Sequence, residues 1–331
     1  MTPFGFFTTA LKPLEKLCAA VCMPFTGNFA APYKAKYPDK IKLNAAVLSD
    51  LHIDGRKERI RKLHHGLSDI ERSLTPNNAL VCVGDTSDTG SRDDWETARG
   101  IFADHKPAEH TLIVCGNHDR PGFNEEYEPY LKLFLEYSRK ISGRELTVPY
   151  FYEVINGYTF IALTQEEDDL LTPEQLSWFE QRMELAAQSG LPVFVFMHES
   201  LNISHGLPYI WEKHWSGERL PDPHRSGIGV NSDDIEKILK KHKNVFLFSG
   251  HIHLGLTGRR QMRSFGFSNF ETDGSLHRIN VPCFMFPNHH GLPSSGLGYQ
   301  LEVYDDRVLI RPRSYASSVW YSRYDKEFIL E

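Results

Sequence analysis

Residues 43–52 read LNAAVLSDLH, an apolar run that ends in the polar residues Asp50 and His52. The first six residues of this run are typical of a buried strand. A helix is expected over about residues 56 to 74, because apolar residues recur there at the three- and four-residue spacing of one helical face. The chain therefore begins its regular part with a strand, a polar turn and a helix.

Two further units of this kind follow. A strand at residues 79–83 ends at Gly84-Asp85, and a strand at 111–115 ends at Gly116-Asn117-His118-Asp119, with a helix expected over 93–103. Parallel strands joined by right-handed crossovers expose their carboxyl ends at the same edge of a sheet. The polar residues of all three units are therefore expected to converge.

Later strands end in histidines. The run at 192–197 precedes His198, and the run at 245–248 precedes Ser249-Gly250-His251-Ile252-His253. Two imidazoles one residue apart on a turn can reach two neighbouring metal ions, although histidine pairs also occur as hydrogen-bonded or exposed residues. Asn156-Gly157 predicts a hairpin, and Thr172-Pro173-Glu174-Gln175 predicts the start of a helix.

Carboxylate, imidazole and amide groups thus follow five separate strands. This donor set suits a pair of zinc, iron or manganese ions, and the absence of thiolates from it argues against a closed structural zinc site. Two ions about 3.5 to 4 Å apart need a bridging ligand, for which a carboxylate is suited. Asp85, on a central strand, is the best placed.

These blocks resemble the five motifs of the calcineurin-like metallophosphoesterases, over roughly residues 43–313. The resemblance implies an α/β fold, a four-layer αββα sandwich of two mixed sheets flanked by helices, with a dinuclear centre at the carboxyl edge of the strands. It also implies two ligand sets and a bridge: Asp50, His52 and His253 for the first metal, Asn117, His198 and His251 for the second, and Asp85 for the bridge.

The implied reaction is phosphoester hydrolysis. Two cations lower the pKa of a bound water towards 7, and the hydroxide attacks phosphorus in line. The resemblance gives His118 the role of protonating the leaving oxygen or stabilising phosphoryl charge, with Asp119 orienting it. The alternative is that His118 is a structural histidine beside the metal site.

The subclass is read from positions next to the motifs. Purple acid phosphatases place a tyrosine three residues after the bridging aspartate, where this chain has Asp88. The motifs are more similar to the class III cyclic-nucleotide and glycerophosphodiester phosphodiesterase branch, which favours a phosphodiesterase over a phosphomonoesterase. Glu199-Ser200 departs from the relatives that have a histidine and prolines there. A catalytically silent scaffold is the remaining alternative, although all seven ligand types are present.

The irregular residues 199–230 are expected to contact the substrate, since cations can bind phosphate and aromatic faces can bind a base. The candidate residues are His205, Trp211, His214, Arg219 and Arg225. The alternative is a packed cover over the site, in which the tryptophans belong to the core and the histidines are solvated.

Composition limits the partners. The 331 residues carry a net charge of −6, so duplex nucleic acid and a nuclease activity are not expected, whereas a small phosphoester such as a nucleotide is. No apolar run approaches the roughly 20 residues of a membrane-spanning helix. Five cysteines without zinc-ribbon spacing, and no secretory signal, predict a reducing cytoplasmic location.

Three segments are expected. Residues 1–42 form an N-terminal extension, 43–313 the catalytic domain and 314–331 a C-terminal tail. Within the extension, apolar residues between Leu14 and Cys22 fall on one helical face. This predicts a short amphipathic helix, which either packs on the domain or contacts a membrane surface or partner.

Overall fold

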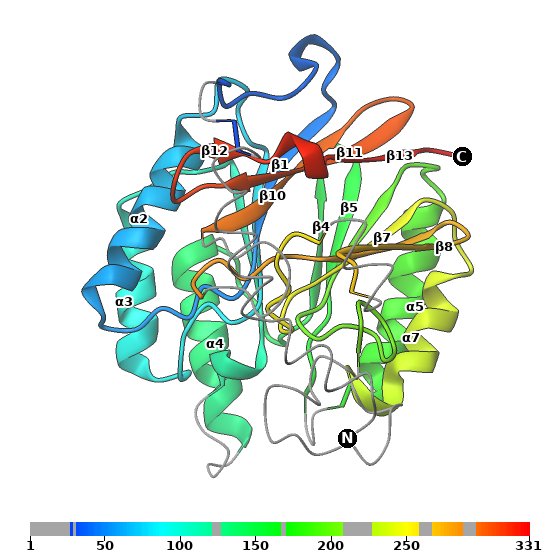
Figure 1. Ribbon diagram of the computed structural model, residues 1–331. Coiled ribbons are helices and arrows are strands. Elements are labelled where there is room, and N and C mark those ends of the chain that lie inside the picture. Colours follow the sequence, from blue (N-terminus) through cyan, green and yellow to red (C-terminus); the bar gives the residue numbers. More distant parts are fainter. Residues whose placement is uncertain are drawn as a thin grey trace, which may run out of the picture.

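The structure is a computed structural model that describes residues 27–28, 31–120, 127–166, 170–207, 227–257, 267–286 and 296–331. Two mixed β-sheets lie between two groups of helices (Figure 1), which confirms the expected four-layer sandwich. The helices on one side are α2 (Lys57–Glu71), α3 (Arg92–Ala103) and α4 (Tyr127–Ser142). Those on the other side are α5 (Pro173–Ala187) and α7 (Ser232–Leu239). Short 3-10 helices occupy Pro38–Lys40, Asn117–Asp119, Gly229–Asn231 and Ser322–Tyr324.

The first sheet has the strand order β12-β11-β10-β1-β2-β3, and β13 pairs with β11. Strands β1, β2 and β3 are parallel, as the repeated strand-helix units predict, and β10 runs antiparallel to β1. The strand bounds are β1 (Leu43–Leu48), β2 (Ala79–Val83), β3 (His110–Val114), β10 (Leu297–Val303), β11 (Arg307–Ser314), β12 (Val319–Trp320) and β13 (Lys326–Ile329).

The second sheet has the order β4-β5-β6-β7-β9-β8. Its four inner strands are parallel, and its two edge strands are antiparallel to their neighbours. The expected hairpin at Asn156-Gly157 connects β4 and β5. The strand bounds are β4 (Phe151–Ile155), β5 (Tyr158–Ala162), β6 (Val193–Phe196), β7 (Val245–Ser249), β8 (Phe270–Asp273) and β9 (Leu276–Asn280).

Apolar side chains fill the space between each pair of layers. Because side chains alternate along a strand, Ala45 and Val47 of β1 enter the core between the sheets, whereas Ala46 and Leu48 enter the core under α2 and α3. A third core lies between the second sheet and helices α5 and α7. Continuous apolar runs such as residues 43–48 are therefore explained by burial on both faces.

The register of the strands places the polar turns side by side at one edge of each sheet. In the first sheet Leu48 pairs with Cys82, and Cys82 pairs with Ile113, so all three turns begin just beyond one edge. In the second sheet Phe196 pairs with Phe248, which places the turns after β6 and β7 together. The fold thus delivers the polar residues of both sheets to one region.

Parts of the expected N-terminal extension and C-terminal tail pack on or belong to the first sheet. Tyr33 is buried, and its ring makes an edge contact with Trp320 at 5.5 Å. Residues 314–331 are no loose tail, because they contain β12 and β13, and Phe328 of β13 enters the core between the sheets. The predicted helix between Leu14 and Cys22 lies outside the described residues. Among the described residues, no helix has the length and apolar character needed to cross a membrane.

Candidate metal centre

Seven predicted ligands follow the carboxyl ends of five strands. Asp50 and His52 follow β1, Asp85 follows β2, and Asn117 opens the 3-10 helix after β3. His198 follows β6, and His251 and His253 follow β7. The first sheet therefore supplies four of these residues and the second sheet three, so the cluster lies where the edges of the two sheets meet.

The carboxylates and imidazoles are within a few ångströms of one another. His253 Nε2 lies 3.2 Å from Asp50 Oδ1 and 3.3 Å from His52 Nε2. Asp85 Oδ2 lies 3.0 Å from His198 Nε2 and 3.6 Å from His52 Nε2. Asp85 thus faces histidines of both sheets, as expected of a bridging group.

Among the described residues, three groups of ligand atoms, each within 4.8 Å, could hold a cation, and two of these groups share Asp85. Asp85, His198 and His251 form one group. The predicted second ligand set also includes Asn117. The other two groups add residues that the sequence did not assign as ligands: Cys283 beside Asp50 and His253, and His118 beside His52 and Asp85.

Buried donors without partners indicate that the cluster fits metal ions. Among the described residues, Asp50 Oδ2, Asn117 Oδ1 and His198 Nε2 are buried and have no hydrogen-bond partner. His198 Nε2 also lies 3.0 Å from Asp85 Oδ2, an ion-pair contact that requires a protonated imidazole. A buried polar atom without a partner is costly, and cations coordinated in the cluster would satisfy these three atoms.

Electrostatics keeps the carboxylates ionised. Burial alone would raise the pKa of Asp50, but His253 and His198 lower it to about 2. The pKa of Asp85 is likewise held well below its usual range, since His198 and His52 outweigh the effect of burial. Burial and the neighbouring His198 lower the pKa of His251 to about 3, which leaves this imidazole neutral. Asp85 raises the pKa of His198 to about 10 despite burial, and the pKa of His253 is also raised. Because metals bind ionised carboxylates and neutral imidazoles, a bound ion would displace a proton from each of these two histidines.

The backbone of these turns is unusual. Asp50, His52, Asp85, His251 and His253 all have φ between 41° and 66°, in the left-handed region that few non-glycine residues adopt. Such conformations cost about 1–3 kcal/mol each and cluster at functional sites. The packed strands on both sides hold the ligand side chains in place before any ligand binds.

Gly84 permits the close approach of the two sheets. It has φ of 81°, and a Cβ atom at this position would overlap the ring of His198. Gly143 has a similar φ of 74° with no atom within 4 Å of such a Cβ, which makes it a matched control.

We expect Gly84→Ala to destabilise the metal-free protein more than Gly143→Ala. The left-handed backbone costs both variants about 1–2 kcal/mol. Overlap with His198 adds about 1–3 kcal/mol to Gly84→Ala alone. Urea unfolding monitored by circular dichroism measures both losses, and equal losses would contradict a close fit between Gly84 and His198.

His118 and Asp119 lie beside the cluster but have different contacts from those expected. The backbone N–H of His118 donates to Asp85 Oδ1 at 2.8 Å, and its Nδ1 lies 2.6 Å from the carbonyl oxygen of Asp88. Asp119 does not orient this ring, because its carboxylate accepts hydrogen bonds from the backbone N–H groups of Ser87 and Gly116. Asp119 therefore shapes the turn, and the Asp88 carbonyl orients His118.

The side chain of Asp88 supports the neighbouring histidine. Its Oδ1 lies 3.1 Å from His52 Nδ1, and Arg59 and His52 hold the pKa of Asp88 at about 2 despite partial burial. Phe286 packs at 4.7 Å from the His52 ring and at 5.7 Å from the His253 ring. The sequence contained a signal for Asp88 in its spacing from Asp85, but none for Phe286.

The predicted substrate loop is only partly described. His205 is buried, its Nδ1 lies 2.7 Å from the Ser268 carbonyl, and its backbone N–H donates to Glu271. These contacts give His205 a structural role and do not support the expected substrate contact. Trp211, His214, Arg219 and Arg225 lie outside the described residues.

The four-layer sandwich carries a buried donor cluster between its sheets, and the residues of this cluster are suited to divalent metal ions. The model of the calcineurin-like phosphoesterase family matches residues 43–255, and the chain belongs to that family. Two divalent metal ions are the cofactors of this family, and the donor set described above fits them.

Several solved structures are similar to this chain. A dimetal phosphatase from Danio rerio has a TM-score of 0.57 at 14% identity, over 88% of this chain and 100% of that one. A purple acid phosphatase from yellow lupin (Lupinus luteus) seeds has a TM-score of 0.58 at 12% identity, over 86% of this chain and 53% of that one. GAP50, described as the anchor in the inner membrane complex of Plasmodium, has a TM-score of 0.52 at 11% identity, over 87% and 89%. These likenesses show the fold, and no curated protein sequence matches the chain.

Proposed function

We propose that this phosphoester hydrolase holds its two ions between the two sheets and acts on phosphodiesters in preference to phosphomonoesters. The buried cluster around Asp85 carries the proposal, because it combines ionised carboxylates with donors that have no other partner among the described residues. The proposed ligands are those that the sequence suggested: Asp50, His52 and His253 for the first ion, Asn117, His198 and His251 for the second, and Asp85 for both.

The ions, when bound, supply the Lewis acidity that activates water near neutral pH and neutralises charge on the phosphoryl oxygens. His118 is proposed to protonate the leaving oxygen. Its Nδ1 must carry a proton, since the Asp88 carbonyl can only accept a hydrogen bond. Nε2 is then the nitrogen that exchanges a proton with the substrate.

The charge balance beside the first ligand set supports the preference for diesters. Arg59 Nη1 lies 2.9 Å from Asp88 Oδ2 and 3.2 Å from Asp54 Oδ2, and Arg56 Nε lies 2.8 Å from Asp54 Oδ2. Both arginines are therefore neutralised by carboxylates. A phosphomonoester carries a charge of about −1.5 to −2 at pH 7, and a diester carries a single negative charge. A site whose nearby arginines are already paired favours the less charged substrate.

The test compares an aryl phosphodiester and an aryl phosphomonoester that share a leaving group. The metal content of the purified protein is measured first, and manganese, iron or zinc is then restored. We expect kcat/KM to be at least about tenfold higher for the diester, a ratio that needs about 1.4 kcal/mol of differential transition-state stabilisation. Activity on the monoester alone would overturn the diester preference. If neither ester is hydrolysed with both ions bound, the alternative of a catalytically silent scaffold is favoured.

The remaining assignments are also proposals. The substrate is proposed to be a small phosphoester such as a nucleotide, with recognition by the irregular segment of residues 199–230. The catalytic domain is proposed to include residues 31–42 and 314–331 in addition to 43–313, because both segments pack on the first sheet. A reducing cytoplasmic location agrees with the free thiols of Cys82, Cys115 and Cys283.

A further inference from the structure

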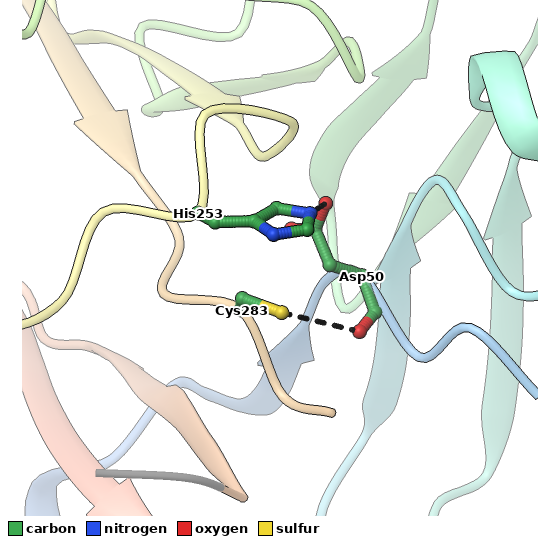
Figure 2. A group of neighbouring side chains, drawn as sticks. All are labelled: Asp50, His253 and Cys283. Atoms are coloured by element: carbon green, nitrogen blue, oxygen red, sulfur yellow. Dashed lines mark hydrogen bonds and ion pairs between the residues drawn. The ribbon is translucent and has the colours of Figure 1, made fainter. Parts of the chain in front are cut away.

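The first proposed metal site contains a thiol that the sequence did not connect to it. Cys283 follows β9 and is completely buried. Its segment runs beside the turn after β1, where the Phe284 N–H donates to the Ser49 carbonyl at 2.9 Å and the Met285 N–H to the Asp50 carbonyl at 3.1 Å. This pairing places the Cys283 sulfur next to Asp50 and His253 (Figure 2).

The two ring nitrogens of His253 face different groups. Nε2 lies 3.2 Å from Asp50 Oδ1, on the side of the proposed ion. The other nitrogen, Nδ1, faces the sulfur of Cys283 (Figure 2), and the two side chains are hydrogen-bonded. The sulfur, a carboxylate oxygen of Asp50 and a ring nitrogen of His253 all lie within 4.8 Å of one another.

The direction of this hydrogen bond follows from the other contacts of the sulfur. The single proton of the thiol is donated to the Asp50 carbonyl at 3.6 Å, and the sulfur accepts from the Phe286 N–H at 3.3 Å. Because its proton is already used, the sulfur can only accept from His253. Nδ1 of His253 then keeps its proton, and Nε2, which faces Asp50 and His52, is the nitrogen that would give up its proton to bind an ion.

The other histidines that present Nε2 to the cluster are fixed in the same tautomer by different groups. His52 Nδ1 contacts the Asp88 carboxylate at 3.1 Å, and His198 Nδ1 contacts the Val83 carbonyl at 2.8 Å. Outer partners of this kind orient metal-binding histidines and set their basicity. The Phe286 ring, inclined by 27° to that of His253, packs against it and restricts its rotation.

We propose that Cys283 is a positioning residue that fixes the tautomer and orientation of His253 and thereby sets the affinity of the first metal site. The proposal rests on the proposed function, since it assigns His253 as a ligand. On this proposal the Nδ1 partner of His253 is a thiol, whereas that of His52 is a carboxylate and that of His198 is a backbone carbonyl.

The first experiment measures the stepwise binding of Mn²⁺ by calorimetry and electron paramagnetic resonance. We expect Cys283→Ala to weaken one of the two binding steps about 10–100-fold, the range typical for loss of an outer partner. Cys283→Ser should lose less Mn²⁺ affinity than Cys283→Ala, because a hydroxyl can accept the same hydrogen bond. Some loss is still expected, since the serine oxygen is held closer to the backbone than the sulfur. Cys82→Ala is the control, since Cys82 is also completely buried but belongs to the core under the helices. It should leave both affinities unchanged.

A double-mutant cycle shows whether the thiol acts through His253. In a His253→Ala background, the further change Cys283→Ala should not alter binding of the remaining Mn²⁺. If it weakens that binding to the same extent as in the wild-type background, Cys283 does not act through His253. If Cys283→Ala proves too unstable, the same cycle is run with Cys283→Ser, for which the expected loss in the wild-type background is smaller.

Cobalt substitution distinguishes a positioning thiol from a ligand. We expect the Co²⁺ protein to lack a thiolate-to-cobalt charge-transfer band in the near ultraviolet. Such a band, absent from Cys283→Ser, would overturn the positioning role and make Cys283 a ligand. Unchanged Mn²⁺ affinities in Cys283→Ala would also overturn the proposal. The proposed function would survive these results, whereas it would fail if the wild-type protein bound no metal.

Discussion

Asp85→Asn is expected to lower kcat by on the order of a thousand-fold or more, the largest effect that we predict. Asp85 Oδ2 faces His198 of one sheet and His52 of the other, and its Oδ1 accepts the backbone N–H of His118. An amide preserves the shape of this residue but removes the charge shared by both proposed half-sites. The measurements are turnover of an aryl phosphodiester and metal content per chain, which should fall below two ions.

Asp69→Asn provides the control for a buried aspartate. Asp69 is almost completely buried and binds Arg313 through both carboxylate oxygens, on the helix-facing side of the first sheet. This change is expected to lower stability without altering kcat of the folded protein. If Asp85→Asn kept two ions and near-normal turnover, the bridging role of Asp85 would be wrong.

His118→Ala is expected to lower kcat by about 10²–10⁴-fold, the range for loss of a general acid, while metal content stays the same. The size of the loss should depend on the leaving group. A nitrophenolate needs little protonation and should show a smaller loss than an alkoxide, which needs a proton to depart. The measurement is therefore kcat for an aryl and an alkyl diester.

His110→Ala is the matched histidine control, because His110 is partly exposed and contacts Glu153 on the edge of the sheet. It should leave both rates unchanged. Equal losses on both substrates for His118→Ala would argue for a structural role of His118, through its contact with the Asp88 carbonyl. A loss of bound metal would argue that His118 is a ligand, as its place beside His52 and Asp85 would allow.

Much of this architecture could be predicted from the sequence because local patterns encode it. The apolar runs that end at Leu48 and Val83 are strands, and the position of each polar residue follows from where its strand stops. Parallel register then forces Asp50 and Asp85 to the same edge. The metal cluster was predictable for this reason, although its residues are spread over 200 positions.

Other features depend on contacts that no local pattern encodes. Cys283 meets His253 only because the segment after β9 hydrogen-bonds to Ser49 and Asp50 through backbone groups, which every residue type possesses. The Asp119 carboxylate binds backbone N–H groups for the same reason, so its sequence position beside His118 was misleading. The strand β13 was missed because its four residues include a single buried side chain, Phe328.

The division of the ligands between the two sheets has a mechanical consequence. On the proposed assignment, each ion is held by at least one residue from each sheet, so neither ion can stay bound if the layers part. By thermodynamic linkage, the free energy of binding adds to the cohesion of the layers, by about 2.7 kcal/mol for each ion at one hundred times its Kd. The ions would thus fasten the sandwich at its catalytic edge, where three turns with five left-handed residues replace the apolar contacts found deeper between the sheets.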